Sequence, residues 1–239
     1  MEMQIIARVH SDFPAKFGIP RQSGLVPELK AKVVFEPGFR SREAVRGLEQ
    51  FSHIWLIWQF SEVPEDTWSP TVRPPRLGGN KRVGVFASRS PFRPNPVGLS
   101  CVRLEKIEEN EELGPVLHIA GADLMDGTPV FDIKPYLPYV DSHPEAQEGF
   151  TGMTRRHRLE VEISEQWLAM VPEEKREALT GILANDPRPS YQHDPARVYG
   201  FSYAGLEVRF TVADGRASVC EICPGEEGRS AGHTERGKA

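Results

Sequence analysis

Seven short apolar or alternating segments in the first part of the chain constrain its fold most strongly. Gly, Pro and charged residues separate these segments, a pattern typical of an antiparallel sheet that closes on itself. One segment is apolar on both faces, as expected for a strand buried between a barrel interior and a second layer. The sequence therefore predicts a small antiparallel β-barrel. Its expected strands are residues 4–9, 32–35, 53–60 (the segment with two apolar faces), 82–87, 97–104, 116–120 and 130–133.

Two regions have helical spacing. Residues 41–51 predict a helix with Ser41 as its N-cap, and residues 172–185 predict a second helix with Pro172 in its first turn. The second helix lies in a region with a different organisation, where strands are expected at residues 160–163, 198–203, 206–212 and 217–222. Ala-Gly and Asp-Gly turns join the last three of these strands into a meander.

The predicted fold class is mainly β with an α+β part. A polar stretch after residue 141 separates the two parts and favours a domain boundary there. We expect a β-barrel domain at residues 1–141 that binds the ligand, and a smaller α+β domain at residues 142–223. Residues 224–239 are polar and rich in glycine, which predicts a disordered tail.

Composition narrows the class of protein. Of 239 residues, 39% are hydrophobic and 26% are charged, which is typical of a globular core. The amino terminus lacks the pattern of a signal peptide, and no segment approaches the roughly 20 apolar residues of a membrane span, so we expect a cytoplasmic protein. The three cysteines are too few for a disulfide framework. Cys220 and Cys223 favour a structural role, because a zinc site needs four ligands.

Positive charge is concentrated in one stretch, although the whole chain has a net charge of −5. Residues 67–104 contain seven Lys or Arg residues, six prolines, four glycines and no acid. Proline fixes φ and glycine permits positive φ, so this stretch is expected to form shaped loops that hold guanidinium groups at set angles. A rigid, electropositive concavity suggests an anionic ligand.

Three carboxylates follow an expected strand. Asp123, Asp126 and Asp132 lie around a tight turn at residues 126–127. They could form one rim of the sheet, or Asp126 could simply cap the turn while Asp132 pairs with an arginine. A metal site is the weaker alternative, because the cluster contains no histidine.

Several motifs rich in Pro, Gly and Arg occur in a fixed order along the chain. Two of them are Pro-Arg-Gln-Ser-Gly-Leu at residues 20–25 and Phe-Arg-Pro-Asn-Pro-Val-Gly-Leu-Ser at residues 92–100. The others lie at residues 44–49, 51–55, 71–79, 84–89, 126–129, 132–136 and 186–191. Together they resemble the TrmO (YaeB-type) family, over roughly residues 1–140 and again in the second domain.

This resemblance implies a tRNA methyltransferase that uses S-adenosylmethionine. Its expected product is threonylcarbamoyladenosine methylated at N6, next to the anticodon of a threonine-type tRNA. The resemblance also implies a small antiparallel β-barrel with an appended domain, and a homodimer. The absence of a GxGxxG fingerprint between a strand and a helix agrees with a fold other than the doubly wound sheet.

Carried over by resemblance, the cofactor contacts fall on segments far apart in the sequence. Glu62 would bind ribose hydroxyls or the amino group, Arg21 or Arg89 the methionine carboxylate, and Leu99 the adenine face. The full expected set is Pro20, Arg21, Gln22, Ser61, Glu62, Arg89, Leu99, Asp123, Leu124, Met125 and Asp126.

Catalysis is expected to need positioning and one proton acceptor. We assign the proton acceptor to Asp126, with Asn95 and Tyr136 as orienting groups. Phe92 and Tyr136 are the aromatic residues available to stack on an anticodon-loop base. Phosphate contacts are expected from Arg73, Arg76, Lys81, Arg82 and Arg93.

Two functions of other classes stay open at this point. One is a tRNA-binding module without catalysis, which would bind RNA independently of S-adenosylmethionine. The other is a metal-assisted phosphoesterase that uses Asp123, Asp126 and Asp132, and whose activity a chelator would abolish.

Overall fold

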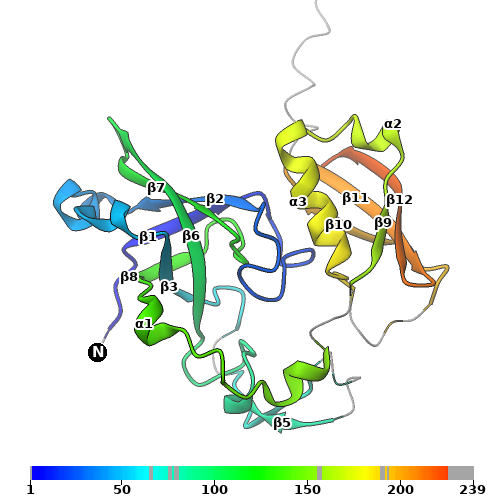
Figure 1. Ribbon diagram of the computed structural model, residues 1–239, viewed down its shortest axis with the longest axis horizontal. Coiled ribbons are helices and arrows are strands. Elements are labelled where there is room, and N and C mark those ends of the chain that lie inside the picture. The colour runs from blue at the N-terminus through cyan, green and yellow to red at the C-terminus, as the bar shows by residue number, and fades with distance from the viewer. Residues whose placement is uncertain are drawn as a thin grey trace, which may run out of the picture.

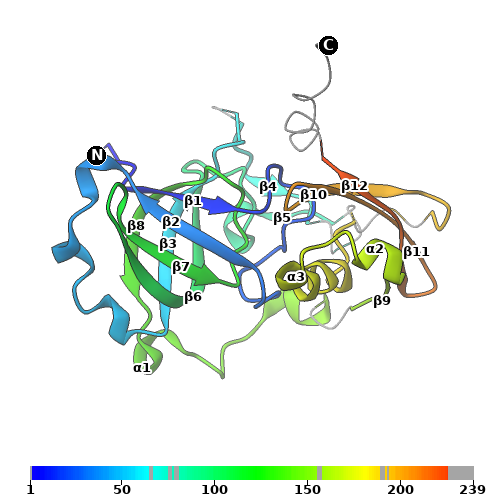
Figure 2. The same cartoon turned by 90° about the horizontal axis from the view of Figure 1, so that it is seen from above.

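The computed structural model describes residues 2–64, 67–74, 77, 81–154, 158–188, 192 and 194–225. Within these residues, a closed barrel lies on one side and a smaller sheet with its helix on the other (Figure 1). Seen from above, the same two parts stand side by side (Figure 2). No helix in the described part of the chain is long and apolar enough to cross a membrane.

Six antiparallel strands form the barrel, in the order β1-β2-β7-β6-β3-β8. Alternate residues face its interior: Ile54, Leu56 and Trp58 of one strand are buried there. The predicted small antiparallel barrel is therefore confirmed. The strands are β1 (Ala7–Ser11), β2 (Lys30–Phe35), β3 (His53–Gln59), β6 (Val97–Asn110), β7 (Gly114–Ala120) and β8 (Pro129–Pro135).

The strand predicted at residues 82–87 does not belong to the barrel. Only β5 (Val83–Gly84) is extended, and it pairs with β4 (Thr71–Val72) in a separate two-stranded sheet. A 3-10 helix follows at once (Val85–Ala87). The N–H of Val85 donates to the carbonyl of Pro70 and the N–H of Ser88 donates to the carbonyl of Val85, so the chain turns here and is no longer extended.

The helix predicted at residues 41–51 is also wrong. The structure has two short 3-10 helices there, Arg42–Val45 and Leu48–Gln50. Between them Gly47 has φ 85°, a left-handed conformation that ends any right-handed helix. The predicted N-cap is confirmed, because the Ser41 side chain accepts a hydrogen bond from the backbone N–H of Glu43.

The smaller sheet has the order β10-β11-β12-β9, with β9 parallel to β12. Its two hairpin turns have positive φ at both central positions (Ala204 and Gly205, Asp214 and Gly215), as the predicted Ala-Gly and Asp-Gly turns require. The predicted meander and long helix are confirmed. The elements are β9 (Glu160–Glu162), α3 (Glu173–Ala184), β10 (Tyr199–Tyr203), β11 (Leu206–Ala213) and β12 (Arg216–Pro224).

Besides the 3-10 helices described above, a 3-10 helix at Pro37–Phe39 follows β2, and three other short helices occur later in the described part of the chain. They are α1 (Pro138–Asp141), a 3-10 helix at Gly149–Thr154 and α2 (Glu165–Leu168). The segment that contains the 3-10 helix runs past the β4–β5 sheet at the bottom of Figure 1. The expected boundary at residues 141–142 stays a prediction, and most of the expected tail lies outside the described residues.

A loop from the barrel's first strand completes the core of the second part. Phe13, Val26 and Leu29 are buried among the side chains of α3 and β10–β12. Gly181 of α3 lacks a Cβ, and one placed there would lie 2.7 Å from Cγ1 of Val26. The backbone N–H of Ala204 also donates to the carbonyl of Asp12 at 2.9 Å. The loop between β1 and β2 is therefore held by both parts of the molecule.

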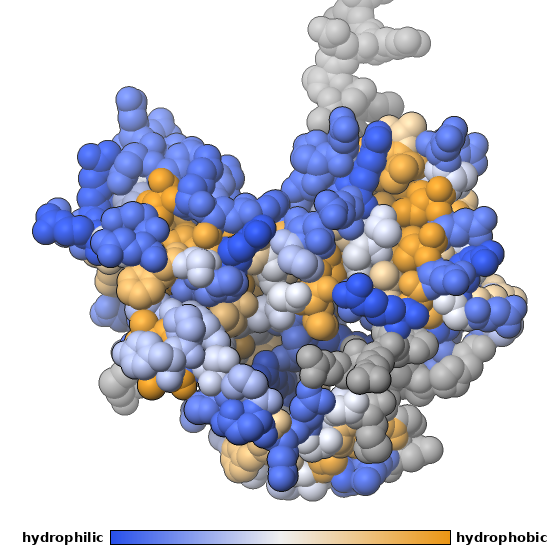
Figure 3. Space-filling model, in the orientation of Figure 1, coloured by the Kyte–Doolittle hydropathy of each residue, from blue (hydrophilic) through white to orange (hydrophobic). Residues whose placement is uncertain are grey.

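Hydrophilic side chains cover most of the face drawn in Figure 3. Near β5, at the bottom of that view, hydrophilic and hydrophobic side chains alternate over the surface.

All three cysteines are free thiols.

Candidate functional site

A cavity of about 500 Å³ lies where the β1–β2 loop meets the end of β3 and the start of β6. Five segments that are distant in sequence line it. Among its lining residues are all but one of the predicted cofactor contacts: Pro20, Arg21, Gln22, Ser61, Glu62, Arg89, Leu99, Asp123, Leu124 and Met125.

Strand pairing explains how this cavity forms. The last residue pairs of β3 and β6 bring Trp58 beside Gly98. A Cβ on Gly98 would lie only 2.3 Å from Cε2 of Trp58, so the indole ring occupies the space that a side chain would take. The Trp58 and Phe60 rings then meet edge to face, with centroids 4.3 Å apart, and form an aromatic wall.

A chain of hydrogen bonds runs from this wall to a carboxylate. Nε1 of Trp58 donates to Oγ of Ser100 at 3.0 Å, and Oγ of Ser100 donates to Oδ1 of Asp123 at 2.6 Å. Ser100 is fully buried, and its hydroxyl has only one proton to give. Because the indole N–H can only donate, the Ser100 proton is directed to Asp123.

The environment of Asp123 perturbs its titration. Burial raises the pKa of the Asp123 carboxyl above its ordinary value, because the charged form loses its hydration. The hydrogen bond from Ser100, backbone N–H groups and the charge of Arg89 oppose this rise in pKa, but burial prevails. A partly buried carboxyl group with a raised pKa in a cavity is a candidate for proton transfer.

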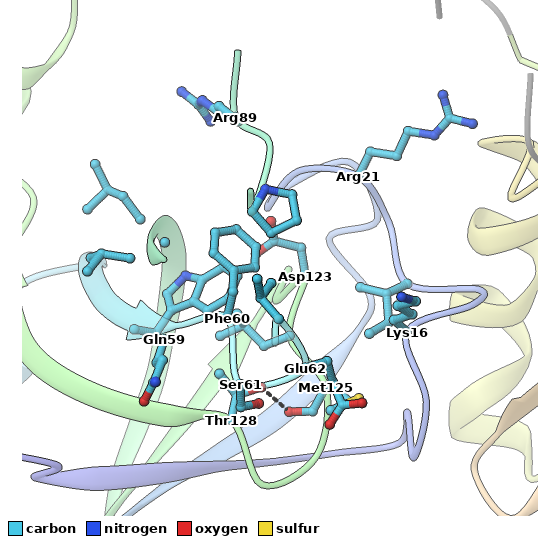
Figure 4. A pocket seen from close by; sticks show the side chains of 18 of the residues that line it. Lys16, Arg21, Gln59, Phe60, Ser61, Glu62, Arg89, Asp123, Met125 and Thr128 are labelled. Carbon is cyan, nitrogen blue, oxygen red and sulfur yellow. Dashed lines mark hydrogen bonds between the residues drawn. The ribbon is translucent and has the colours of Figure 1, made fainter. Parts of the chain in front are cut away.

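The cavity is lined by both basic and acidic side chains, and Lys16 lies on the same side as Glu62. Figure 4 shows Arg21 and Arg89 at one end, Glu62 and Met125 at the other, and Asp123 between them. Arg89 donates to the side-chain oxygen of Gln22. Arg21 donates to the backbone carbonyl of Arg188 at 2.8 Å and so links the cavity to the second part of the molecule.

Three predicted catalytic residues do not line the cavity. Asp126 accepts a hydrogen bond from the backbone N–H of Ser11 at 3.0 Å, as a turn-capping residue does. Asn95 lies in an exposed turn, and Tyr136 packs against Trp55 with ring centroids 5.7 Å apart. Gly127, with φ 77°, follows Asp126 in a tight turn, and the Asp126 carboxylate contacts β1 through Ser11.

A larger groove of about 1,260 Å³ adjoins the cavity. The two share six lining residues: Arg21, Gln22, Ser88, Arg89, Pro91 and Phe92. Of the predicted phosphate contacts, Arg73 and Arg82 line the groove, and Arg93 lines the cavity while donating to two loop carbonyls. Lys81 lines neither space, and Arg76 lies outside the described residues.

The sequence did not point to Trp58, Ser100 or Phe86 as site residues. Trp58 had one signal, its position at the end of a doubly apolar segment. Ser100 had one signal, its place at the end of the motif at residues 92–100, but the motif did not show that Ser100 lies between Trp58 and Asp123. Phe86 lines the groove with a side chain that is 77% exposed. Its signal was a large aromatic residue within an otherwise basic loop.

The three aspartates of the predicted cluster do not converge. Asp132 pairs with Lys134 at 2.8 Å, and Asp126 is directed to β1. Among the residues described by the structure, no group of three or more His, Cys, Asp or Glu side chains could hold a metal ion.

Comparison with known proteins gives consistent matches over nearly the whole chain. The family model for the tRNA-methyltransferase O N-terminal domain matches residues 8–142, and that for the TrmO C-terminal domain matches residues 156–225. A relative from Escherichia coli K12, named tRNA (adenine(37)-N6)-methyltransferase, is 38% identical over 93% of this chain and 98% of its own length.

A curated relative and a solved structure from Pseudomonas aeruginosa are also similar. One, provisionally named an S-adenosylmethionine-dependent methyltransferase, is 42% identical over 86% of this chain and 90% of its own length. The other is a crystal structure of TrmO, which superposes with a TM-score of 0.77 at 35% identity. That match covers 94% of this chain and 97% of the solved chain.

Proposed function

The chain belongs to the tRNA-methyltransferase O family, and on that premise we propose that it methylates N6 of tRNA adenine 37 with S-adenosylmethionine as methyl donor. The observation that carries this proposal is the cavity beside β3. It gathers predicted donor contacts from five separate segments around one partly buried carboxyl group, that of Asp123.

The cavity fits S-adenosylmethionine in size and in chemistry. Its volume of about 500 Å³ lies within the roughly 300–1,000 Å³ of small-molecule sites. Trp58, Phe60 and Leu99 offer apolar surface for an adenine. Arg89 is positively charged and could pair with the carboxylate of the donor's methionine part. Glu62 is negatively charged and could pair with its ammonium group. When bound, the donor supplies an electrophilic methyl group.

Asp123 is the proton acceptor that the geometry supports. Bond formation at N6 requires the N6 proton to leave, and a carboxylate within hydrogen-bond reach can take it. Ser100 holds one oxygen of Asp123 and limits the rise of its pKa, so the carboxylate keeps a fixed direction. The same role predicted for Asp126 stays a prediction, and the hydrogen bond from Ser11 argues against it.

We infer from the family resemblance that the target adenine already carries a threonylcarbamoyl group. The test is mass spectrometry of nucleosides from tRNA incubated with the purified protein, with and without S-adenosylmethionine. The expected result is a gain of one methyl on threonylcarbamoyladenosine only when the donor is present. If unmodified adenine were methylated instead, the proposed substrate would be wrong, but the methyltransferase activity would be supported.

Two further measurements, of tRNA binding and of phosphate release, test the alternative functions. Unchanged nucleosides together with donor-independent tRNA binding would identify a binding module. Phosphate release that a chelator abolishes would identify a phosphoesterase, which the separation of Asp123, Asp126 and Asp132 disfavours.

We also propose a homodimer, on the basis of the resemblance, and a cytoplasmic location, on the basis of the sequence. An apolar surface supports the dimer: Tyr139 and Val140 of α1 are 84% and 50% exposed beside the Trp55–Tyr136 pair. Sedimentation equilibrium tests it, and a monomer mass at micromolar concentration would contradict it.

A further inference from the structure

We propose that Phe86 is the stacking platform for the anticodon-loop base next to the target adenine. This inference deepens the proposed function and rests on it. Phe86 lines the groove of about 1,260 Å³ that adjoins the cavity, and its side chain is 77% exposed. Single exposed apolar residues are ordinary, so the case depends on how this one is held and on what surrounds it.

The backbone beneath Phe86 is fixed. Its neighbour Val85 is 1% exposed, and the N–H of Val85 donates to the carbonyl of Pro70 at 3.0 Å. The backbone N–H and hydroxyl of Ser88 both donate to the carbonyl of Val85, at 3.1 and 2.8 Å. The 3-10 turn therefore presents the Phe86 ring outward on a rigid support, at low entropic cost for binding.

No aromatic ring of the described residues packs against Phe86. Its ring faces are available to a planar ligand. The other stacking candidates suggested by the sequence differ: Tyr136 is engaged with Trp55 and His53 on the outside of the barrel. Phe92 is 44% exposed and lies at the junction of groove and cavity.

The charge of the groove identifies a polyanion as its occupant. Arg21, Arg73, Arg82 and Arg89 line it, and none of its described lining residues is Asp or Glu. Basic side chains interleaved with exposed aromatics are the pattern of single-stranded nucleic-acid sites, where arginines hold phosphates and rings stack on bases. Because groove and cavity share lining residues, a target adenine at the mouth of the donor cavity places its neighbour in the groove.

The first test measures binding of an anticodon stem-loop RNA without methyl donor. We expect Phe86→Ala and Phe86→Leu to weaken binding about 5- to 150-fold, because each loses one base–aromatic stack. Phe86→Trp keeps an aromatic ring and should bind the RNA as the wild type does. Leucine keeps apolar bulk without a π-face, so wild-type affinity in Phe86→Leu, or in Phe86→Ala, would overturn the proposal. Phe39→Ala is the matched control, because it removes another exposed phenylalanine from a 3-10 turn that lines neither space.

Salt dependence separates stacking from phosphate contact. Phe86→Ala should weaken binding without changing the slope of log affinity against log salt, whereas Arg82→Ala should reduce that slope by about one. A reduced slope in Phe86→Ala would show that the substitution disturbed the arginines instead, and would overturn the stacking role.

Photocrosslinking locates the base. Two RNAs carry 5-iodouridine on either side of the target adenine, and mass spectrometry should find an adduct at Phe86 with one of them. An adduct at Phe86 with neither RNA counts against the proposal. Methyl transfer by the wild-type protein is measured separately: its failure removes the proposed function, whereas normal transfer with no crosslink removes only the stacking role.

Discussion

At the scale of single residues, three side chains carry the chemistry of the cavity. Trp58, Ser100 and Asp123 form a chain of hydrogen bonds with one direction. The Trp58 indole donates to the Ser100 hydroxyl, and that hydroxyl donates its only proton to the Asp123 carboxylate. Burial raises the pKa of the carboxyl at its end, and the serine limits that rise. Two predictions belong to this scale.

Replacing Asp123 should reduce kcat far more than replacing Asp126. We expect Asp123→Asn to lower kcat by about 100- to 10,000-fold, the usual worth of a general base. Asp126→Asn keeps an oxygen that accepts from Ser11, so its turnover should equal that of the wild type. Steady-state kinetics, with donor affinity measured by calorimetry, checks both. Loss of turnover in Asp126→Asn alone would restore the role first assigned to Asp126.

Removing the Ser100 hydroxyl should move the acid limb of the pH–rate profile. The Ser100 hydrogen bond favours the charged form and so lowers the pKa of Asp123. Its loss in Ser100→Ala raises that pKa further, and because catalysis needs the carboxylate, the acid limb shifts to higher pH. Ser218→Ala, which removes an exposed hydroxyl from β12, should leave the profile unchanged. A limb that stays in place means that another group titrates.

At the scale of elements, strand pairing and glycine shape the site. The end of β3 and the start of β6 bring Trp58 over Gly98, and the ring fills the volume that a Cβ would need. Gly98 is needed here because the Trp58 ring lies too close for any other residue to fit. Gly47 acts differently, because its positive φ divides the expected helix into two turns.

Gly98→Ala should therefore displace the Trp58 ring. Overpacking of this kind costs about 1–3 kcal/mol of unfolding free energy. It should also weaken donor binding, since the Trp58–Phe60 wall lines the cavity. Denaturant unfolding and calorimetry measure the two effects. Gly38→Ala is the control, since a Cβ there meets nothing within 4 Å, and equal behaviour of the two variants would refute the packing argument.

At the scale of the whole molecule, the β1–β2 loop joins the barrel to the second part. It supplies Phe13, Val26 and Leu29 to the second core, and it carries Pro20, Arg21 and Gln22 to the cavity. The donor site therefore depends on packing in the second part of the molecule, although none of the described residues of that part lines the cavity. The Arg188 carbonyl contributes by holding Arg21.

Val26→Ala should loosen this connection. We expect a loss of about 1–3 kcal/mol in unfolding free energy, together with weaker donor binding and faster hydrogen exchange at residues 20–24. Val45→Ala removes the same two methyl groups from the barrel core and should destabilise without changing donor affinity. If both variants bind the donor as the wild type does, the loop is positioned by the barrel alone.

Local patterns determined much of this protein from the sequence alone. Alternating segments specified the barrel strands, positive-φ turns specified the meander, and ordered motifs identified the family and the segments of the cavity. These signals depend on neighbours within a few residues or on direct resemblance. Only the tertiary structure decided that Asp123 enters the cavity while Asp126 turns to β1, that Ser100 connects Trp58 to Asp123, and that Phe86 stands exposed in the groove. These outcomes depend on the side to which a tight turn directs each side chain and on which residues meet across paired strands, and both are set by the closed barrel as a whole.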